Sequence, residues 1–188
     1  MTVAGTIDAA RFRAVLGHFC TGVTVITAHD GTRPVGFACQ SFAALSLDPP
    51  LVLFCPARTS RTWPIIEGVG RFAVNVLAAD QRAVSGVFGA RGEDKFAAVA
   101  WRAAASGAPL LDGALTWLDC AVEAVHEAGD HFVVVGRVLE LGEIRDGRPL
   151  LFYRGRYTAT ESVPADGDGQ VREDLAELLT WPRPDDWF

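Results

Sequence analysis

Residues 22–39 read Gly22-Val-Thr-Val-Ile-Thr-Ala28, then His29-Asp-Gly-Thr-Arg-Pro34, then Val35-Gly-Phe-Ala-Cys39. The two outer runs are rich in β-branched and other apolar residues, which favour strands. The middle run contains Asp30-Gly31, a pair that is typical of tight turns between antiparallel strands. This stretch therefore predicts a β-hairpin, and the fold class depends on how often the rest of the chain repeats it.

The remaining sequence repeats the strand pattern more often than it favours helices. Further strands are expected at 51–55, 71–77, 115–125, 131–141 and 150–153, and the third and fourth of these form a second long hairpin. Because the strands do not alternate regularly with long helices, a doubly wound parallel sheet is not expected. The pattern predicts a mostly β protein, an antiparallel barrel or sandwich with few helices.

Three short helices are expected within the body of the chain, at 11–19, 60–67 and 80–87. The first has apolar residues at the i, i+3, i+4 and i+7 positions of an amphipathic helix, with Asp8 as its N-cap and a stop by Gly22. These apolar positions are Phe12, Val15, Leu16 and Phe19.

Composition limits the class of protein. A length of 188 residues with 49% hydrophobic and 21% charged residues indicates one globular domain plus at most an appendage. The formal net charge of −6 argues against a nucleic-acid partner, which requires a basic face. Without an apolar run of about 20 residues or a secretory signal, we expect no membrane partner and a cytoplasmic location.

The negative charge is concentrated near the C-terminus. Residues 162–188 contain seven acidic residues and two arginines, a sum of −5, which leaves −1 for residues 1–161. The expected organisation is a domain at 8–158, a polar linker at 159–171, and an acidic tail with a short helix at 172–188.

Familiar metal and catalytic motifs are missing from the sequence. The four cysteines lie 19, 16 and 65 residues apart without zinc spacing, so we expect buried free thiols and no metal. Gly68-Val-Gly70 precedes a strand-like run, which is the wrong context for a dinucleotide fingerprint. The calcium-loop-like run from Asp166 has Val171 where the turn needs glycine. A chain this poor in acid–base groups either binds without chemistry or uses the chemistry of a cofactor.

Three segments carry the polar groups of a candidate site. Gly36 permits close backbone approach, and the residues that follow it place amide and hydroxyl groups at a strand end. Thr59-Ser-Arg-Thr-Trp63 gathers hydroxyl groups and a guanidinium at a helix start, which suits a phosphate. Gly129-Asp-His131 forms the tip of the late hairpin.

These segments resemble the flavin reductase family. The resemblance covers about residues 8–158, and it implies an FMN-binding split barrel, a six-stranded antiparallel barrel of Greek-key type. The matching blocks occur in the family's order: Gly36 to Pro50, Arg71-Phe-Ala-Val-Asn-Val-Leu77, Asp94-Lys-Phe96, Gly129-Asp-His131, and Pro149-Leu-Leu-Phe-Tyr-Arg-Gly-Arg-Tyr157.

The resemblance also implies roles for individual residues. The residues expected to contact FMN are Ala38, Cys39, Gln40, Ser41 and Phe42 at the ring, Thr59, Ser60, Arg61, Thr62 and Trp63 at the ribityl chain and phosphate, and Lys95 and Phe96 at the phosphate end. Those expected to face NADH are His131, Phe152, Tyr153, Arg154 and Gly155. No catalytic side chain is required for direct hydride transfer, and His131 is the one that could assist.

Each of these residues also has an ordinary structural explanation. Phe42, Phe96 and Phe152 suit a hydrophobic core, Arg61 suits a solvated surface, and His131 suits a turn. The complete set in the family's order favours the flavin site.

The function implied by the resemblance is an NADH-dependent FMN reductase, a homodimer that supplies reduced FMN to a separate oxygenase. The subgroup that it resembles serves hydroxylation of a phenolic substrate in steroid ring degradation. Three alternatives stay open: a flavin reductase that supplies another phenol hydroxylase, an oxidase that acts on its own substrate, and a non-catalytic FMN-binding module. The choices between NADH and NADPH, and between FMN and FAD, stay open.

Overall fold

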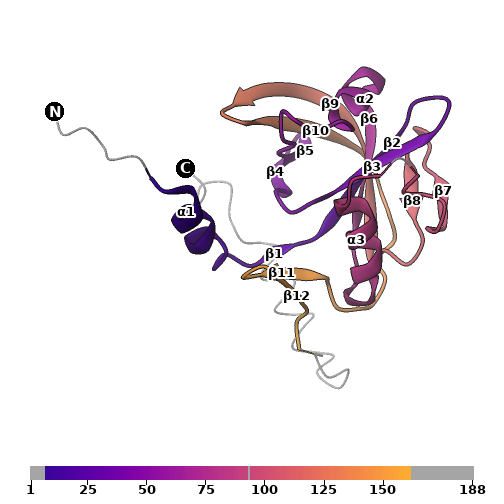
Figure 1. The fold of residues 1–188 in the computed structure, drawn as a ribbon. Coiled ribbons are helices and arrows are strands. Elements are labelled where there is room, and N and C mark those ends of the chain that lie inside the picture. The colour runs from indigo at the N-terminus through magenta and orange to yellow at the C-terminus, as the bar shows by residue number, and fades with distance from the viewer. Residues whose placement is uncertain (1–6, 93, 162–188) are drawn as a thin grey trace.

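The computed structural model describes residues 7–92 and 94–161 of the chain. Antiparallel strands form most of the regular secondary structure, with short helices around them (Figure 1). The largest sheet has seven strands in the order β3-β2-β6-β9-β10-β5-β4, and all neighbours are antiparallel. Its strands are β2 (Thr24–His29), β3 (Pro34–Cys39), β4 (Ala43–Leu47), β5 (Pro50–Phe54), β6 (Arg71–Val76), β9 (Thr116–Ala128) and β10 (His131–Leu141).

The mostly β class and the antiparallel pairing are confirmed, but the sheet has seven strands where six were expected. The strand that the sequence did not indicate is β4, whose residues Ala-Ala-Leu-Ser-Leu include none that is β-branched. β4 pairs with β5, with a register shift between Ala44 and Ser46, and four of its five residues are exposed. Its conformation is thus imposed by the neighbouring strand, because its own side chains carry no strand pattern.

The first hairpin is formed by β2 and β3, as predicted. Thr24 pairs with Cys39 at one end and His29 with Pro34 at the other. One carboxylate oxygen of Asp30 accepts the backbone N–H of Thr32 at 2.7 Å and of Arg33 at 2.8 Å, which closes the turn. These two bonds lower the pKa of the Asp30 carboxyl group.

Aromatic side chains fill the interior of the large sheet. The ring of Phe54 on β5 lies 5.1 Å from that of Phe72, 5.8 Å from that of Trp63 and 6.2 Å from that of Phe37. Phe54 and Phe72 are completely buried, and Trp63 is 1% exposed. Because Trp63 begins a helix and Phe37 lies on β3, this cluster fixes both elements relative to the sheet.

Three α-helices were predicted, and all three form with shifted bounds: α1 (Ala9–Leu16), α2 (Trp63–Val69) and α3 (Arg82–Gly89), the last preceded by a 3₁₀ turn, η1 (Ala79–Gln81). Asp8 caps α1 as expected and accepts the N–H of Arg11 at 2.7 Å. The helix ends at Leu16, so Phe19 lies outside it, contrary to the expected span. None of its residues is buried within this chain.

Two smaller sheets flank the large one. β1 (Thr21–Gly22), β11 (Leu151–Tyr153) and β12 (Arg156–Thr158) form a three-stranded sheet beside α1, and β7 (Trp101–Ala103) pairs with β8 (Pro109–Leu111) (Figure 1). The hydroxyl groups of Ser85 on α3 and Tyr157 on β12 lie 3.0 Å apart. The small sheet is therefore attached to α3 by a polar contact. The sequence did not indicate β7, β8 or β12, which are three residues each.

The four cysteines are free thiols, as predicted, but only Cys39 and Cys120 are buried, whereas Cys55 is half-buried and Cys20 is exposed. Burial raises the pKa of the Cys120 thiol to about 12, and the neighbouring charge of Asp119 adds to this effect. None of the helices in the described part of the chain has the length and apolarity needed to cross a bilayer. The predicted acidic tail lies outside the described residues.

Candidate functional site

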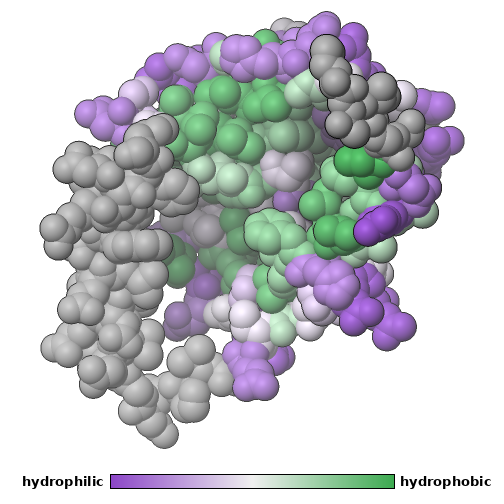
Figure 2. Space-filling view, turned by 90° about the vertical axis from the view of Figure 1, so that its left-hand side faces the viewer, coloured by the Kyte–Doolittle hydropathy of each residue, from purple (hydrophilic) through white to green (hydrophobic). Residues whose placement is uncertain are grey.

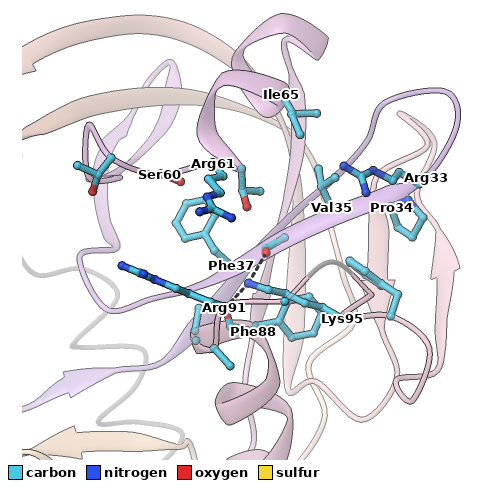
Figure 3. Close-up of a pocket in the computed structure, with 18 residues that line it drawn as sticks. Arg33, Pro34, Val35, Phe37, Ser60, Arg61, Ile65, Phe88, Arg91 and Lys95 are labelled. Atoms are coloured by element: carbon cyan, nitrogen blue, oxygen red, sulfur yellow. Dashed lines mark hydrogen bonds between the residues drawn. The ribbon is translucent and has the colours of Figure 1, made fainter.

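A pocket of about 710 Å³ lies along β3, between the loop that precedes α2 and the segment that follows α3 (Figure 3). This volume falls within the range of about 300–1,000 Å³ that is typical of small-molecule sites. The lining residues are Arg33, Pro34, Val35, Gly36, Phe37, Ala38, Thr59, Ser60, Arg61, Thr62, Ile65, Phe88, Gly89, Ala90, Arg91, Gly92, Lys95 and Phe96.

The charged side chains among the described lining residues all have one sign. Four of the lining residues are basic, namely Arg33, Arg61, Arg91 and Lys95, and none of the described lining residues is acidic. These four residues come from three separate parts of the chain. They gather in one cavity although residues 1–161 as a whole carry almost no net charge. A cationic cavity with apolar walls fits a ligand that combines a planar apolar part with an anionic group.

The loop at residues 59–62 offers unpaired hydrogen-bond donors. The hydroxyl oxygen of Ser60 accepts the N–H of Trp63 at 3.1 Å, which caps the first turn of α2. By contrast, the backbone N–H groups of Thr59, Arg61 and Thr62 donate to no group among the described residues. The free N–H groups of two successive residues, Arg61 and Thr62, beside a guanidinium are typical of an anion-binding loop.

Glycine at position 36 allows α3 to pack closely against β3. A Cβ atom at Gly36 would lie 3.0 Å from a ring carbon of Phe88 and 2.9 Å from the carbonyl oxygen of Ile26. The sequence indicated a close backbone approach at this position, and the structure shows that the approaching group is the ring of Phe88. This contact brings the C-terminal end of α3 to the pocket.

Lys95 connects the two sides of this contact. Its ammonium group donates to the carbonyl oxygen of Phe88 at 2.9 Å and to that of Gly36 at 3.4 Å (Figure 3). Phe88 lies in the last turn of α3, where unpaired carbonyl groups attract a cation. Partial burial lowers the pKa of the Lys95 ammonium group.

The sequence profile of the flavin reductase like domain matches residues 16–161. The chain belongs to the flavin reductase family. It is 56% identical to the flavin-dependent monooxygenase reductase subunit HsaB of Rhodococcus jostii over 188 residues, which cover 98% of this chain and 94% of that protein.

Two further relatives support membership of the flavin reductase family. The FMN reductase (NADH) SmoA of Agrobacterium fabrum is 42% identical over 155 residues, covering 82% of this chain and 88% of that protein. The crystal structure of nitrilotriacetate monooxygenase component B from Mycobacterium thermoresistibile matches with 57% identity and a TM-score of 0.81, over 86% of this chain and 93% of that chain. The predicted family is thus confirmed.

The structure brings together at one pocket seven of the residues predicted from the flavin reductase resemblance: Ala38, Thr59, Ser60, Arg61, Thr62, Lys95 and Phe96. It adds two arginines that the sequence analysis missed, Arg33 and Arg91. Arg33 follows an Asp-Gly turn, and Arg91 follows a short helix, so both resemble ordinary solvated surface residues in the sequence. No local signal identifies them.

The remaining residues predicted to contact FMN, four at the ring and Trp63 at the ribityl chain and phosphate, lie next to the pocket or in the core. Cys39, Gln40, Ser41 and Phe42 continue from β3 beyond Ala38, and the Ser41 hydroxyl group accepts the N–H of Cys55 at 3.0 Å. This bond holds the segment beside the chain that leads to the 59–62 loop. Trp63 lies in the hydrophobic core, where its indole N–H has no hydrogen-bond partner among the described residues.

His131 lies close to the start of the same loop. The tip of the β9–β10 hairpin is bonded to residues 56–58, since Arg58 N–H donates to the carbonyl oxygen of Asp130 at 2.9 Å and Ala57 forms a β-bridge with His131. The ring of His131 lies 2.8 Å from the Asp130 carboxylate, and it lowers the pKa of that carboxyl group. His131 is not among the lining residues of the pocket.

The four other residues predicted to face NADH lie on β11 of the three-stranded sheet and in the turn that follows it. Phe152 packs edge-on against Tyr157 with ring centroids 5.3 Å apart, and Tyr153 packs against His18. Arg154, which has a φ of 49°, donates its N–H to the carbonyl oxygen of Gly17. Within one chain, these residues and Gly155 do not line the pocket.

Proposed function

We propose that this protein is an NADH-dependent FMN reductase that supplies reduced FMN to a separate flavin-dependent monooxygenase. The observation that carries the proposal is the pocket beside β3, with four basic residues, no acidic residue among its described lining and three free backbone N–H groups. The family membership and the relative named FMN reductase (NADH) support the choice of flavin and reductant.

The residues present fit FMN. The free N–H groups of the 59–62 loop, together with Arg61, would bind the phosphate, and Lys95 would add positive charge. The segment Ala38–Phe42 would contact the isoalloxazine ring through its backbone and side chains. His131 and the residues at 152–155 would orient the nicotinamide nucleotide.

The chemistry explains why none of the described lining residues has to act as a general acid or base. Bound FMN supplies a ring that accepts a hydride directly from NADH. The protein has to hold two rings in register, and this positioning accounts for the gain in rate. Backbone N–H donors beside the ring would stabilise the negative charge that develops during transfer. No side chain needs to exchange a proton with NADH.

The experiment is to mix the purified protein with FMN and NADH and follow the absorbance of NADH. We expect oxidation of NADH that depends on FMN. Tight binding of FMN without NADH oxidation would favour a non-catalytic binding module, and no response to FMN at all would rule out the proposed function. Replacing NADH by NADPH, and FMN by FAD, in the same assay defines the preferred pair.

The proposed partner is an oxygenase that hydroxylates a phenolic substrate in steroid ring degradation. The first relative described above is named as a reductase subunit of a flavin-dependent monooxygenase, which supports a two-component system. The steroid assignment rests on the resemblance of the sequence. Addition of this protein, NADH and FMN to a purified oxygenase of that pathway should start hydroxylation of its phenol, and failure while NADH is oxidised would point to another phenol hydroxylase.

We also propose the domain organisation and location indicated by the sequence. Residues 8–158 would form the flavin-binding domain, followed by a linker at 159–171 and an acidic tail at 172–188. The four free thiols suit the reducing cytoplasm.

The proposed assembly is a homodimer, and the observation that supports this proposal is an exposed apolar face. Hydrophobic side chains gather on the side of the molecule where α1 lies (Figure 2). On α1, Phe12, Val15 and Leu16 are each more than half exposed, and Phe19 beyond it is 75% exposed. An amphipathic helix that buries no residue in its own chain needs a partner to cover its apolar stripe.

Leu16→Glu should convert the dimer to a monomer, because it places a charge within the apolar stripe. The measurement is the mass in solution by light scattering at a fixed protein concentration. The matched control is Ala14→Glu, which adds the same charge on the opposite side of the same helix. A dimer that withstands Leu16→Glu, or that dissociates equally with Ala14→Glu, would contradict an interface built on this stripe.

A further inference from the structure

Two neighbouring side chains, Lys95 and Phe96, close against the last turn of α3. The Lys95 ammonium group donates to the carbonyl oxygen of Phe88 at 2.9 Å, and the ring of Phe96 packs edge-on against the ring of Phe88 with centroids 5.0 Å apart. Asp94 holds the turn from which both side chains project, because its carboxylate accepts the N–H of Ala97 at 3.0 Å. Lys95 and Phe96 therefore fix the same residue of α3, one through its carbonyl oxygen and the other through its ring.

The carbonyl oxygen of Phe88 depends on Lys95 for a hydrogen bond. The last carbonyl groups of an α-helix have no donor within the helix. At the end of α3, the Gly86 carbonyl oxygen accepts the N–H of Ala90, whereas Lys95 is the only donor to the Phe88 carbonyl oxygen among the described residues. A charged donor forms a strong bond at such a helix end. The ammonium group is thus used by the protein itself.

The same ammonium group also reaches β3. It lies 3.4 Å from the carbonyl oxygen of Gly36, the residue whose missing Cβ atom allows the Phe88 ring to approach. Lys95 is the only lysine in the chain. Its compact ammonium group can reach two converging carbonyl oxygens, for which the planar fork of an arginine is less suited. An ammonium group has three N–H donors, so two of the three are directed at the backbone.

The residues that these contacts hold in place are 89–92, which follow Phe88 and line the pocket. All four are exposed, so burial does not fix their positions. Two of them are glycines, which lose more backbone freedom on ordering than other residues do. Arg91 is the one basic residue of this segment, and its side chain extends away from the Lys95 ammonium group (Figure 3). The position of Arg91 therefore depends on the contacts at Phe88.

We propose that Lys95 is a positioning residue whose bond to Phe88 holds residues 89–92, and with them Arg91, at the pocket. Its effect on an anionic ligand passes through Arg91, and Lys95 does not itself contact the phosphate. The inference rests on the proposed flavin site, and it changes the role that the family resemblance implies for Lys95.

The first test is cleavage of the ligand-free protein by trypsin after Arg91, because an exposed segment is cut when its backbone can leave its position. Lys95→Met removes both hydrogen bonds and should speed this cleavage about tenfold or more, as expected for the loss of a bond to a charged group. The fragments are measured by mass spectrometry. Arg102→Met, the matched control, removes a cation that stacks over Trp117 outside the pocket, and it should not change the rate. Cleavage after Arg137 in β10 reports global unfolding and should stay slow.

The second test is a double-mutant cycle in FMN binding. Lys95→Met and Arg91→Ala should each raise the dissociation constant for FMN. The double variant should match the weaker single variant within about twofold, because two residues that act as one unit do not have additive effects. Independent contacts with the phosphate would multiply the two effects, and that result, or unchanged FMN binding in Arg91→Ala, would overturn the proposal.

Asp94→Ala separates position from charge. It removes a negative charge and releases the Ala97 N–H, while Lys95 stays in the chain. We expect weaker FMN binding and faster cleavage after Arg91, because the turn that carries Lys95 is loosened. Tighter FMN binding in Asp94→Ala, or wild-type cleavage after Arg91 in Lys95→Met, would overturn the proposal. A wild-type protein that binds no FMN would contradict the proposed function, and the cleavage rates would then decide the role of Lys95.

Discussion

Arg61→Ala should raise the dissociation constant for FMN by at least about tenfold. Arg61 lies in the loop that also contains three free backbone N–H groups, so its guanidinium group would share the phosphate with them. A hydrogen bond to a charged group contributes about 1.5–3 kcal/mol, which corresponds to a change of roughly 10- to 150-fold in affinity. The measurement is a fluorescence titration of FMN at constant ionic strength.

The same titration with Arg61→Lys and Arg102→Ala provides the comparison. Lysine retains the charge but not the two-pronged geometry, so its affinity should fall between those of the wild type and Arg61→Ala. Arg102→Ala removes one arginine outside the pocket and should leave FMN binding unchanged. An unaltered dissociation constant in Arg61→Ala would mean that Arg61 is a solvated surface residue with no part in the site.

Phe54→Ala should lower the free energy of unfolding by about 3–5 kcal/mol. Phe54 is completely buried, and its ring packs against Phe72, Trp63 and Phe37. Deleting it leaves a cavity between β5, β6, α2 and β3, which a close-packed interior cannot fill. For a domain of this size, the loss corresponds to a fall of roughly 6–20 °C in Tm.

The measurement is denaturant unfolding at a fixed protein concentration, because association changes the apparent stability. Phe54→Leu keeps much of the apolar volume and should lose less. Because Phe37 lines the pocket and Trp63 begins α2, FMN affinity should also weaken in the alanine variant. A loss below about 1 kcal/mol would show that the core relaxes around this position.

Most of the large sheet could be predicted because its strands carry local patterns. The Asp-Gly turn and β-branched runs of the first hairpin determine it without reference to any distant residue. β4 has no such pattern, and it is a strand because β5 supplies its hydrogen bonds. β7, β8 and β12 are too short for a periodic pattern to develop.

The candidate site likewise contains residues that could be predicted from the sequence and residues that could not. Thr59 to Thr62 gather hydroxyl groups and a guanidinium within four residues, so they could be identified from the sequence. Arg33 and Arg91 could not, because each is a single arginine in a polar setting. They reach one pocket only because the first hairpin and the end of α3 meet at Gly36, a contact between residues that are far apart in the chain.

The sequence by itself determined the family, the antiparallel class and the absence of acid–base machinery, because these depend on residue types and on spacing along the chain. The tertiary structure decided which basic residues share a cavity and that α1 keeps its apolar stripe exposed. The physical reason is that the gathering of basic side chains and the burial of apolar ones depend on distances in space, which spacing along the chain does not give. Such distances are set by the packing of β3, α2 and α3 around Phe54 and Phe88.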